Sequence, residues 1–285
     1  DKMPTSSQLV RKLRLLSGFL LGGVVVSALM LALGEETMRA WGWRVPFVIG
    51  GLLGMIALYL RLNLEETPIF KELQENERKQ VANKRSLMSM LVEEWPNLVK
   101  SMGLVAIYNV CYYVVLGYIP GYLTNELGYS ASFGSVLGMV GTLSMLLLVP
   151  FSGLLADRVG RKRLIALGCI LLIVFSIPAF TMLQTHNVVL VYVAVLGLLV
   201  AQLLFEGAMG ATLVSLFKAP VRFSALALSY NLSVSLFGGT APLVNTWLIG
   251  QTGNTMIPAY YLIGAAVVGL VAILMTEDRT GKPMP

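Results

Sequence analysis

The sequence predicts an all-α integral membrane protein, a bundle of about eight transmembrane helices. Three observations lead to this fold class. Hydrophobic residues make up 56% of the 285 residues and charged residues only 13%, about half the share found in soluble domains. The apolar residues gather in runs long enough to cross a bilayer, which takes about 20 residues as a helix. Short polar segments rich in Lys and Arg separate these runs.

Eight apolar runs are long enough to be spans. A short charged segment separates the first two, and Trp41 and Trp43 extend the second into the membrane interface, where such rings are favoured. A polar stretch over 62–97 forms the longest break, and short polar turns divide the later runs. The expected spans cover 15–33, 45–61, 99–123, 131–156, 164–183, 188–217, 223–250 and 256–276.

The positions of the cations predict how the chain lies in the membrane. An even number of spans puts both termini on the same side. If that side is the cytoplasm, every Lys and Arg except Arg39 and Arg44 lies there, and cytoplasmic loops carry such an excess of positive charge. We therefore expect a multi-pass protein of the plasma (cytoplasmic) membrane with both termini cytoplasmic. For most of these cations, setting the orientation is a sufficient role.

Charge and cysteine content argue against several other classes of protein. The net charge of +6 does not indicate a nucleic-acid partner, because the cations lie in loops between apolar runs rather than on one face of a folded domain. Cys111 and Cys169 both lie inside apolar runs and form neither a disulfide framework nor a metal site. The sequence shows no nucleophile–base set, metal cluster or phosphate-binding loop. We expect no cofactor and no enzymatic activity.

The most informative segment lies over 153–163, between two of the apolar runs. It reads Gly153-Leu-Leu-Ala-Asp157-Arg158-Val-Gly160-Arg161-Lys162-Arg163, with four cations among its last six residues. This pattern resembles the signature loop of the major facilitator superfamily of transporters. Stretches over 42–47, 64–70 and 222–242 further resemble the metabolite:proton symporter branch of that superfamily. The stretches 109–113 and 258–262 are most similar to its proline/betaine members.

The resemblance implies a major facilitator-type helix bundle, in which a complete member has twelve helices in two six-helix halves. Here the signature loop occurs once and only two spans precede the long polar stretch, so the eight spans correspond to the fifth to twelfth helices. On this basis 1–61 holds an N-terminal tail and the last two helices of the first half. Residues 62–98 form the cytoplasmic central loop, and 99–285 form the second six-helix half. We expect the first four helices to have been lost naturally or to lie outside this sequence.

The resemblance also implies a function, secondary active transport of a small polar organic solute with protons by alternating access. A zwitterion such as proline or glycine betaine is favoured, since no Lys or Arg lies deep in a span to bind a di- or tricarboxylate. The expected partners are the solute, protons and the lipid bilayer. Two alternatives remain, a remnant or fragment that does not transport and an organic-acid symporter of the citrate or shikimate kind. Coupling to sodium instead of protons also remains open.

Glu206 is the only carboxylate deep within a span. A charged side chain there costs about 2.5–3.5 kcal/mol on insertion scales, so such residues usually face a cavity or a partner. Removal of water disfavours the charged form of a carboxylate, which is the property that proton coupling requires. Glu206 is therefore the expected proton-coupling residue. The alternative is a neutral, hydrogen-bonded Glu that joins two helices.

Amide and tyrosine side chains on three spans are the candidates for solute binding. Amides and tyrosines hydrogen-bond carboxylates, and tyrosine faces attract quaternary ammonium groups. For the tyrosines, including the nearby Tyr108, Tyr118 and Tyr122, the alternative is packing or a place in the aromatic belt. The expected solute-binding residues are Asn109, Tyr112, Tyr113, Gln202 and Asn231.

The signature segment has an expected role in gating by resemblance. Asp157 can pair with a cation of the segment and hold one conformation at the cytoplasmic side, while Gly153 permits close helix approach and Gly160 a tight turn. The alternative is that the segment only sets orientation. His186, the single histidine, is expected in an external turn and receives no role in proton transfer. The expected gating residues are Gly153, Asp157, Arg158, Gly160, Arg161, Lys162 and Arg222.

Overall fold

The structure, a computed structural model, describes residues 22, 24–26, 28–29, 32–34, 36–63, 92–218 and 221–277. Every regular element among these residues is helical, so the predicted all-α fold is confirmed. The chain divides into two compact units, Asp1–Leu87 and Met88–Pro285.

The first unit contributes a short π-helix and one long α-helix to the described residues. The π-helix η1 covers Met38–Gly42 and α2 covers Arg44–Asn63. At their junction the guanidinium of Arg44 lies 5.0 Å from the centre of the Trp43 ring, and the Phe47 ring packs edge-on against Trp43 with centroids 6.1 Å apart. The Trp43 ring thus contacts one charged and one apolar side chain. Tryptophan is enriched at membrane interfaces, where polar and apolar surroundings meet in the same way.

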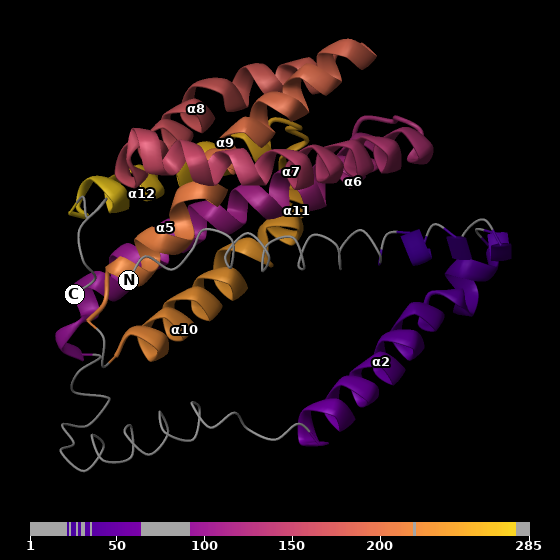
Figure 1. Cartoon of the computed structure of the whole chain (residues 1–285). Coiled ribbons are helices and arrows are strands. Elements are labelled where there is room, and N and C mark those ends of the chain that lie inside the picture. The colour runs from indigo at the N-terminus through magenta and orange to yellow at the C-terminus, as the bar shows by residue number, and fades with distance from the viewer. Residues whose placement is uncertain are drawn as a thin grey trace. The chain divides into compact units, whose positions relative to one another are not determined.

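In the second unit, π-helical turns interrupt two of the long helical stretches. One stretch is α5 (Trp95–Tyr112), η2 (Tyr113–Tyr118) and α6 (Ile119–Asn125), and the other is α10 (Arg222–Ser233), η3 (Val234–Gly238) and α11 (Ala241–Thr252). The uninterrupted helices are α7 (Ala131–Val159), α8 (Arg161–Leu183), α9 (Val188–Ser215) and α12 (Ile257–Leu274) (Figure 1). Single π-helical turns within α-helices are frequent at functional sites.

Seven helical stretches in the described residues are long and apolar enough to cross a membrane. They match seven of the eight expected spans. The largest difference in a boundary is at the start of the second expected span, which begins at Ala40 instead of residue 45. The expected first span, 15–33, falls largely outside the described residues. The chain is thus a multi-pass membrane protein.

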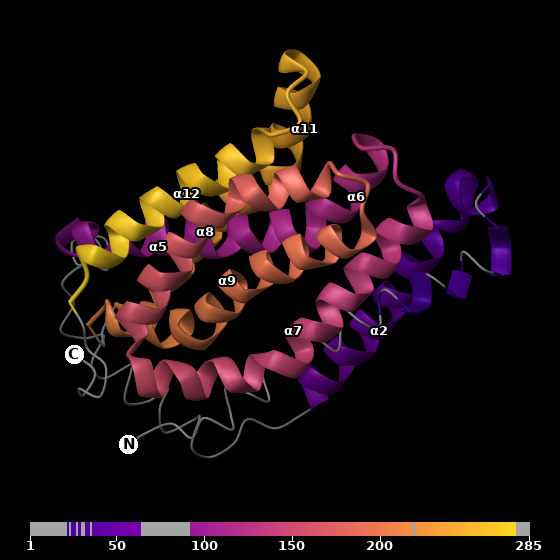
Figure 2. The same ribbon diagram turned by 90° about the horizontal axis from the view of Figure 1, so that it is seen from above.

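Helix α9 packs along α8 and against α7, while α12 packs against both α8 and α5, and α5 packs against α10 and η3. Figure 2 shows α8 and α9 running alongside each other. Their close approach depends on a small residue, because a Cβ on Gly168 would lie 2.7 Å from the ring of Phe205. The Phe205 ring is fully buried. Glycine thus allows these two helices to pack closely around a large side chain.

Aromatic side chains hold three loops together at one end of the second unit. The Tyr129 ring stacks on the His186 ring with centroids 4.8 Å apart, and its hydroxyl donates to the Leu183 carbonyl at 2.8 Å. The Tyr122 hydroxyl donates to the Thr255 carbonyl, also at 2.8 Å. Tyr122 is only 1% exposed, so a place in the aromatic belt is wrong for this residue.

Candidate functional site

Glu206 lies well inside α9 and is only 8% exposed. Its Oε1 accepts hydrogen bonds from the Tyr108 hydroxyl at 2.6 Å and from Gln202 Nε2 at 3.3 Å. Tyr108 belongs to α5, so the first bond joins α5 to α9. Such hydrogen bonds offset part of the cost of taking a carboxylate out of water. Gln202 can reach Glu206 because residues four apart share one face of a helix.

The sequence analysis did not predict the role of Tyr108, for which it offered packing or a place in the aromatic belt as the alternative to solute binding. A place in the aromatic belt is wrong for Tyr108, because its hydroxyl donates to a buried carboxylate of another helix. One sequence feature could have revealed this. Belt residues lie near the ends of a span, whereas Tyr108 lies near the middle of the span Trp95–Asn125.

Gln202 presents a second polar feature at the same place. Its side chain is fully buried, and its Nε2 donates to Glu206. Its Oε1 has no hydrogen-bond partner among the residues that the structure describes. Buried acceptors nearly always find a donor, so an exception calls for a water molecule, an ion or a ligand group. The face of α9 that carries Gln202 and Glu206 therefore has unused capacity to accept a hydrogen bond.

Asn109, Tyr112 and Tyr113 lie where α5 passes into η2. Asn109 is 5% exposed and its Nδ2 donates to the Val105 carbonyl at 3.0 Å. The rings of Tyr112 and Tyr113 pack edge to face with centroids 6.0 Å apart. On the other side, a Cβ on Gly238 of η3 would lie 3.0 Å from both Asn109 Cβ and Tyr113 Cδ2. The two π-helical turns thus approach each other at these candidate binding residues.

The structure brings the predicted binding residues together only in part. Gln202 and Glu206 are in direct contact, and Asn109 and Tyr113 both pack against η3. Asn231 lies on α10, where it is exposed and its Nδ2 donates to the Ala227 carbonyl of its own helix at 2.7 Å. Its place in a shared site stays a prediction.

The signature segment forms the sharp connection between α7 and α8. Gly160 is the single residue between the two helices, and its φ of 96° lies in the region that favours glycine. Gly153 differs from expectation, because a Cβ there would meet no atom within 4 Å among the described residues. Gly207 of α9 makes the close approach instead, since a Cβ there would collide with the carbonyl of Ser152 on α7. The close contact therefore adjoins Glu206 in the sequence.

The charged residues of the segment occupy one end of the bundle. Asp157 and Arg158 lie exposed in the last turn of α7, and Arg161 opens α8. Lys162 Nζ donates to the Leu274 carbonyl at 3.0 Å and the Thr276 carbonyl at 2.6 Å, at the end of α12. A cation at the C-terminal end of a helix satisfies unpaired carbonyls and interacts favourably with the helix dipole.

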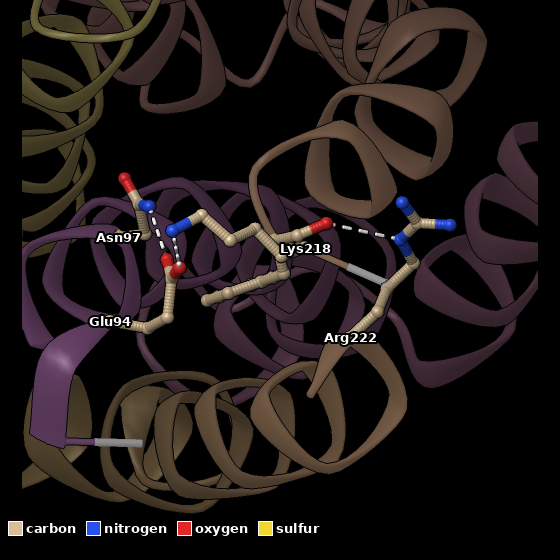
Figure 3. A network of polar contacts seen from close by, with 5 residues as sticks. Glu94, Asn97, Lys218 and Arg222 are labelled. Atoms are coloured by element: carbon tan, nitrogen blue, oxygen red, sulfur yellow. Dashed lines mark hydrogen bonds and ion pairs between the residues drawn. The ribbon is translucent and has the colours of Figure 1, made fainter. Parts of the chain in front are cut away.

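A polar network that the sequence did not predict lies where α9 passes into α10 (Figure 3). Glu94 precedes α5 and is 7% exposed; its Oε2 accepts from Asn97 Nδ2 at 2.6 Å, and its Oε1 lies 3.6 Å from Lys218 Nζ. Arg222 Nε donates to the Phe217 carbonyl at 3.1 Å. An acidic residue before Trp95-Pro96 is a helix-start pattern, and it could have located the beginning of α5.

Comparisons with known proteins give one family and several relatives. The family described as Major Facilitator Superfamily matches residues 8–239. The Proline/betaine transporter of Escherichia coli (strain K12) is 38% identical over 275 residues, which cover 94% of this chain and 55% of the relative.

Two other relatives have similar coverage. The Glycine betaine/proline/ectoine/pipecolic acid transporter OusA of Dickeya dadantii (strain 3937) is 37% identical over 275 residues, 94% of this chain and 55% of the relative. The Putative proline/betaine transporter of Staphylococcus haemolyticus (strain JCSC1435) is 35% identical over 273 residues, 94% of this chain and 57% of the relative. The chain thus spans little more than half the length of these relatives.

Proposed function

This chain belongs to the Major Facilitator Superfamily, and from that premise we propose that it works in secondary active transport of a zwitterion such as proline or glycine betaine. In this proposal the solute moves together with protons by alternating access. The names of the similar proteins support the solute class, because they are transporters of proline and betaine and, in one case, also of ectoine and pipecolic acid.

The observation that carries the proton-coupling part of the proposal is the buried Glu206. Its carboxylate is 8% exposed and receives hydrogen bonds from a tyrosine of α5 and a glutamine of α9. A carboxylate can accept a proton, and this one lies between two helices of a membrane bundle with polar side chains beside it. Proton exchange within a membrane requires both a proton acceptor and polar partners.

The distribution of cations supports a zwitterion over a di- or tricarboxylate. Within the described spans, every Lys and Arg lies in the first or last six residues. The interior offers tyrosines and amides instead, from Asn109, Tyr112, Tyr113 and Gln202. These groups can bind one carboxylate and, through the ring faces, one cationic group.

The same proposal includes the topology. We assign 62–98 to the cytoplasmic central loop, 99–285 to the second six-helix half, and both termini to the cytoplasm. The basic loops support this assignment, because Lys162 reaches the end of α12 and Lys218 pairs with Glu94 before α5. These contacts gather at the ends of helices that the charge distribution puts on one side.

Uptake into proteoliposomes tests the proposal directly, with the protein as its gene encodes it. We expect labelled proline and glycine betaine to accumulate above equilibrium when the outside is made acidic, and citrate to stay out. A sodium gradient at constant pH serves as the control and should drive no accumulation. Uptake of citrate without betaine would overturn the solute class, and accumulation driven only by sodium would overturn proton coupling. Absence of any uptake would favour a chain that does not transport by itself.

A second test concerns the signature segment. Asp157→Asn is expected to slow initial uptake by about fivefold, which corresponds to a surface charge pair worth about 1 kcal/mol, while membrane insertion stays intact. Uptake is compared at matched protein abundance in the membrane. The matched control is Glu126→Gln, which removes a carboxylate after α6, at the opposite end of the second unit. Equal uptake by Asp157→Asn and the parent would leave the segment with orientation as its only role.

A further inference from the structure

Among the described residues, polar contacts tie α5 and the residue before it to α9 and the residues that follow α9. Just before α5, Glu94 pairs with Lys218 at 3.6 Å, and the lysine side chain is 76% exposed. Further along α5, the Tyr108 hydroxyl donates to Glu206 at 2.6 Å. The first contact lies at an end of the bundle, and the second is enclosed by it. Only the second includes the group that exchanges a proton in the proposed function.

The strength of the second contact depends on the charge of Glu206. An O–H···O hydrogen bond of about 2.5–2.7 Å is typical of an ionised acceptor, and such bonds are roughly twice as strong as neutral ones. Tyr108 Oη lies 2.6 Å from Glu206 Oε1, a direct hydrogen bond. A carboxyl group that has taken up a proton is a weaker acceptor. The tie between α5 and α9 is therefore sensitive to protonation.

We propose that Tyr108 is the positioning residue that transmits the protonation of Glu206 to the solute-binding part of α5. While Glu206 is ionised, the Tyr108 hydroxyl holds α5 against α9. When a proton from water binds to the Glu206 carboxylate, Tyr108 keeps its own proton, the hydrogen bond weakens, and α5 is held less firmly against α9 at this point. This inference rests on the proposed function, because it requires that Glu206 exchanges protons.

The position of Tyr108 on α5 makes such a shift consequential. Asn109 is the next residue, and Tyr112 lies one helical turn further along. The π-helical turn η2 begins at Tyr113, which packs against Gly238 of η3. A π-helical turn departs from regular α-helical hydrogen bonding, so it can absorb a small movement of the α5 segment before it.

Other titratable groups near Glu206 do not compete for this role. Groups that interact electrostatically with Glu206 include Tyr108, Cys111 and Tyr112 of α5 and Tyr230 of α10. Tyrosine and cysteine side chains are neutral near pH 7 in their ordinary state. Within this group, Glu206 is the carboxyl group.

Tyr108→Phe tests the proposal, since it removes one hydroxyl and keeps the ring. We expect proton-driven accumulation to fall about tenfold while solute exchange is retained. The pH profile of uptake should differ from that of the parent, because the hydrogen bond that depends on the charge of Glu206 is absent. The matched control is Tyr118→Phe on the same span, whose hydroxyl accepts from Thr246 Oγ1 at 3.4 Å. Its pH profile should equal that of the parent.

The uptake and pH profile of Tyr108→Phe are compared with those of Glu206→Gln. If Tyr108→Phe leaves the pH of half-maximal uptake unchanged while Glu206→Gln abolishes proton-driven accumulation, the inference is overturned and the proposed function stands. If Glu206→Gln retains proton-driven accumulation, the inference falls together with the coupling role of Glu206, while proton-driven transport by the protein stands. A purely structural role of Tyr108 would lower uptake and exchange alike without moving the pH profile, and this result would also overturn the inference.

A distance measurement decides the question without the Tyr108 variant. Val99 of α5 is 57% exposed and Val200 of α9 is 47% exposed, so both accept spin labels after replacement by cysteine, while the native Cys111 and Cys169 are fully buried. We expect the distance between the labels to differ between acidic and alkaline pH, and to be independent of pH in Glu206→Gln. A distance that is independent of pH in the parent would overturn the inference.

Discussion

Replacing Glu206 by glutamine is expected to abolish proton-driven accumulation of the solute and to spare solute exchange. Glutamine keeps the size of the side chain and its carbonyl can still accept from Tyr108, but it cannot take up a proton. In proteoliposomes with an imposed pH gradient, internal solute should therefore reach only the equilibrium level. Exchange of external labelled solute for internal unlabelled solute is measured in the same preparation, because it requires alternating access without net proton movement.

The control for this experiment is a carboxylate of the same unit that lies outside the spans. Glu126→Gln makes the same chemical change after the end of α6 and should leave the accumulation ratio unchanged. If Glu206→Gln accumulates solute as the parent does, Glu206 is a structural residue that joins α5 to α9. If exchange is lost together with accumulation, the side chain is needed for the movement itself rather than for coupling.

The membrane spans could be predicted from the sequence because a bilayer leaves few choices. Each crossing needs a continuous apolar helix, since every backbone polar group must find its partner within the segment. The same property hides how the helices face one another. A helix that is apolar all round carries no stripe to orient it, so nothing along α5 shows that Tyr108 turns toward Glu206 of α9. That contact joins residues 98 positions apart and results from tertiary packing.

The glycines illustrate the same limit. Their presence in the spans predicts close helix approach, and Gly134 fulfils this, because a Cβ there would lie 2.7 Å from the carbonyl of Pro120. Gly153 was expected to act similarly, yet it has open space where its Cβ would be. Gly207 was not singled out, although it packs directly on the backbone of α7. Which glycine meets a neighbour depends on the rotation of each helix about its axis, and composition does not encode that rotation.

Gly207→Ala is therefore expected to destabilise the contact between α7 and α9. The added Cβ would collide with the carbonyl of Ser152 and approach Gly153 N to 3.1 Å. Because these are backbone atoms, no side chain can move aside and a helix must shift. Overpacking of this kind typically costs about 1–3 kcal/mol, and each kcal/mol lowers the melting temperature by about 2–4 °C for a unit of this size. The midpoint of thermal unfolding of the purified protein in detergent measures the effect.

Gly210→Ala on the same helix provides the matched control. A Cβ at Gly210 would meet no atom within 4 Å in the described part of the chain. Alanine also has the higher helix propensity, so this variant should be at least as stable as the parent. Equal midpoints of thermal unfolding for the two variants would show that α7 can move away from the added methyl group at Ser152 without loss of stability. A lower midpoint for Gly207→Ala alone would establish that the backbone beside Glu206 is in direct contact with the helix that carries the signature segment.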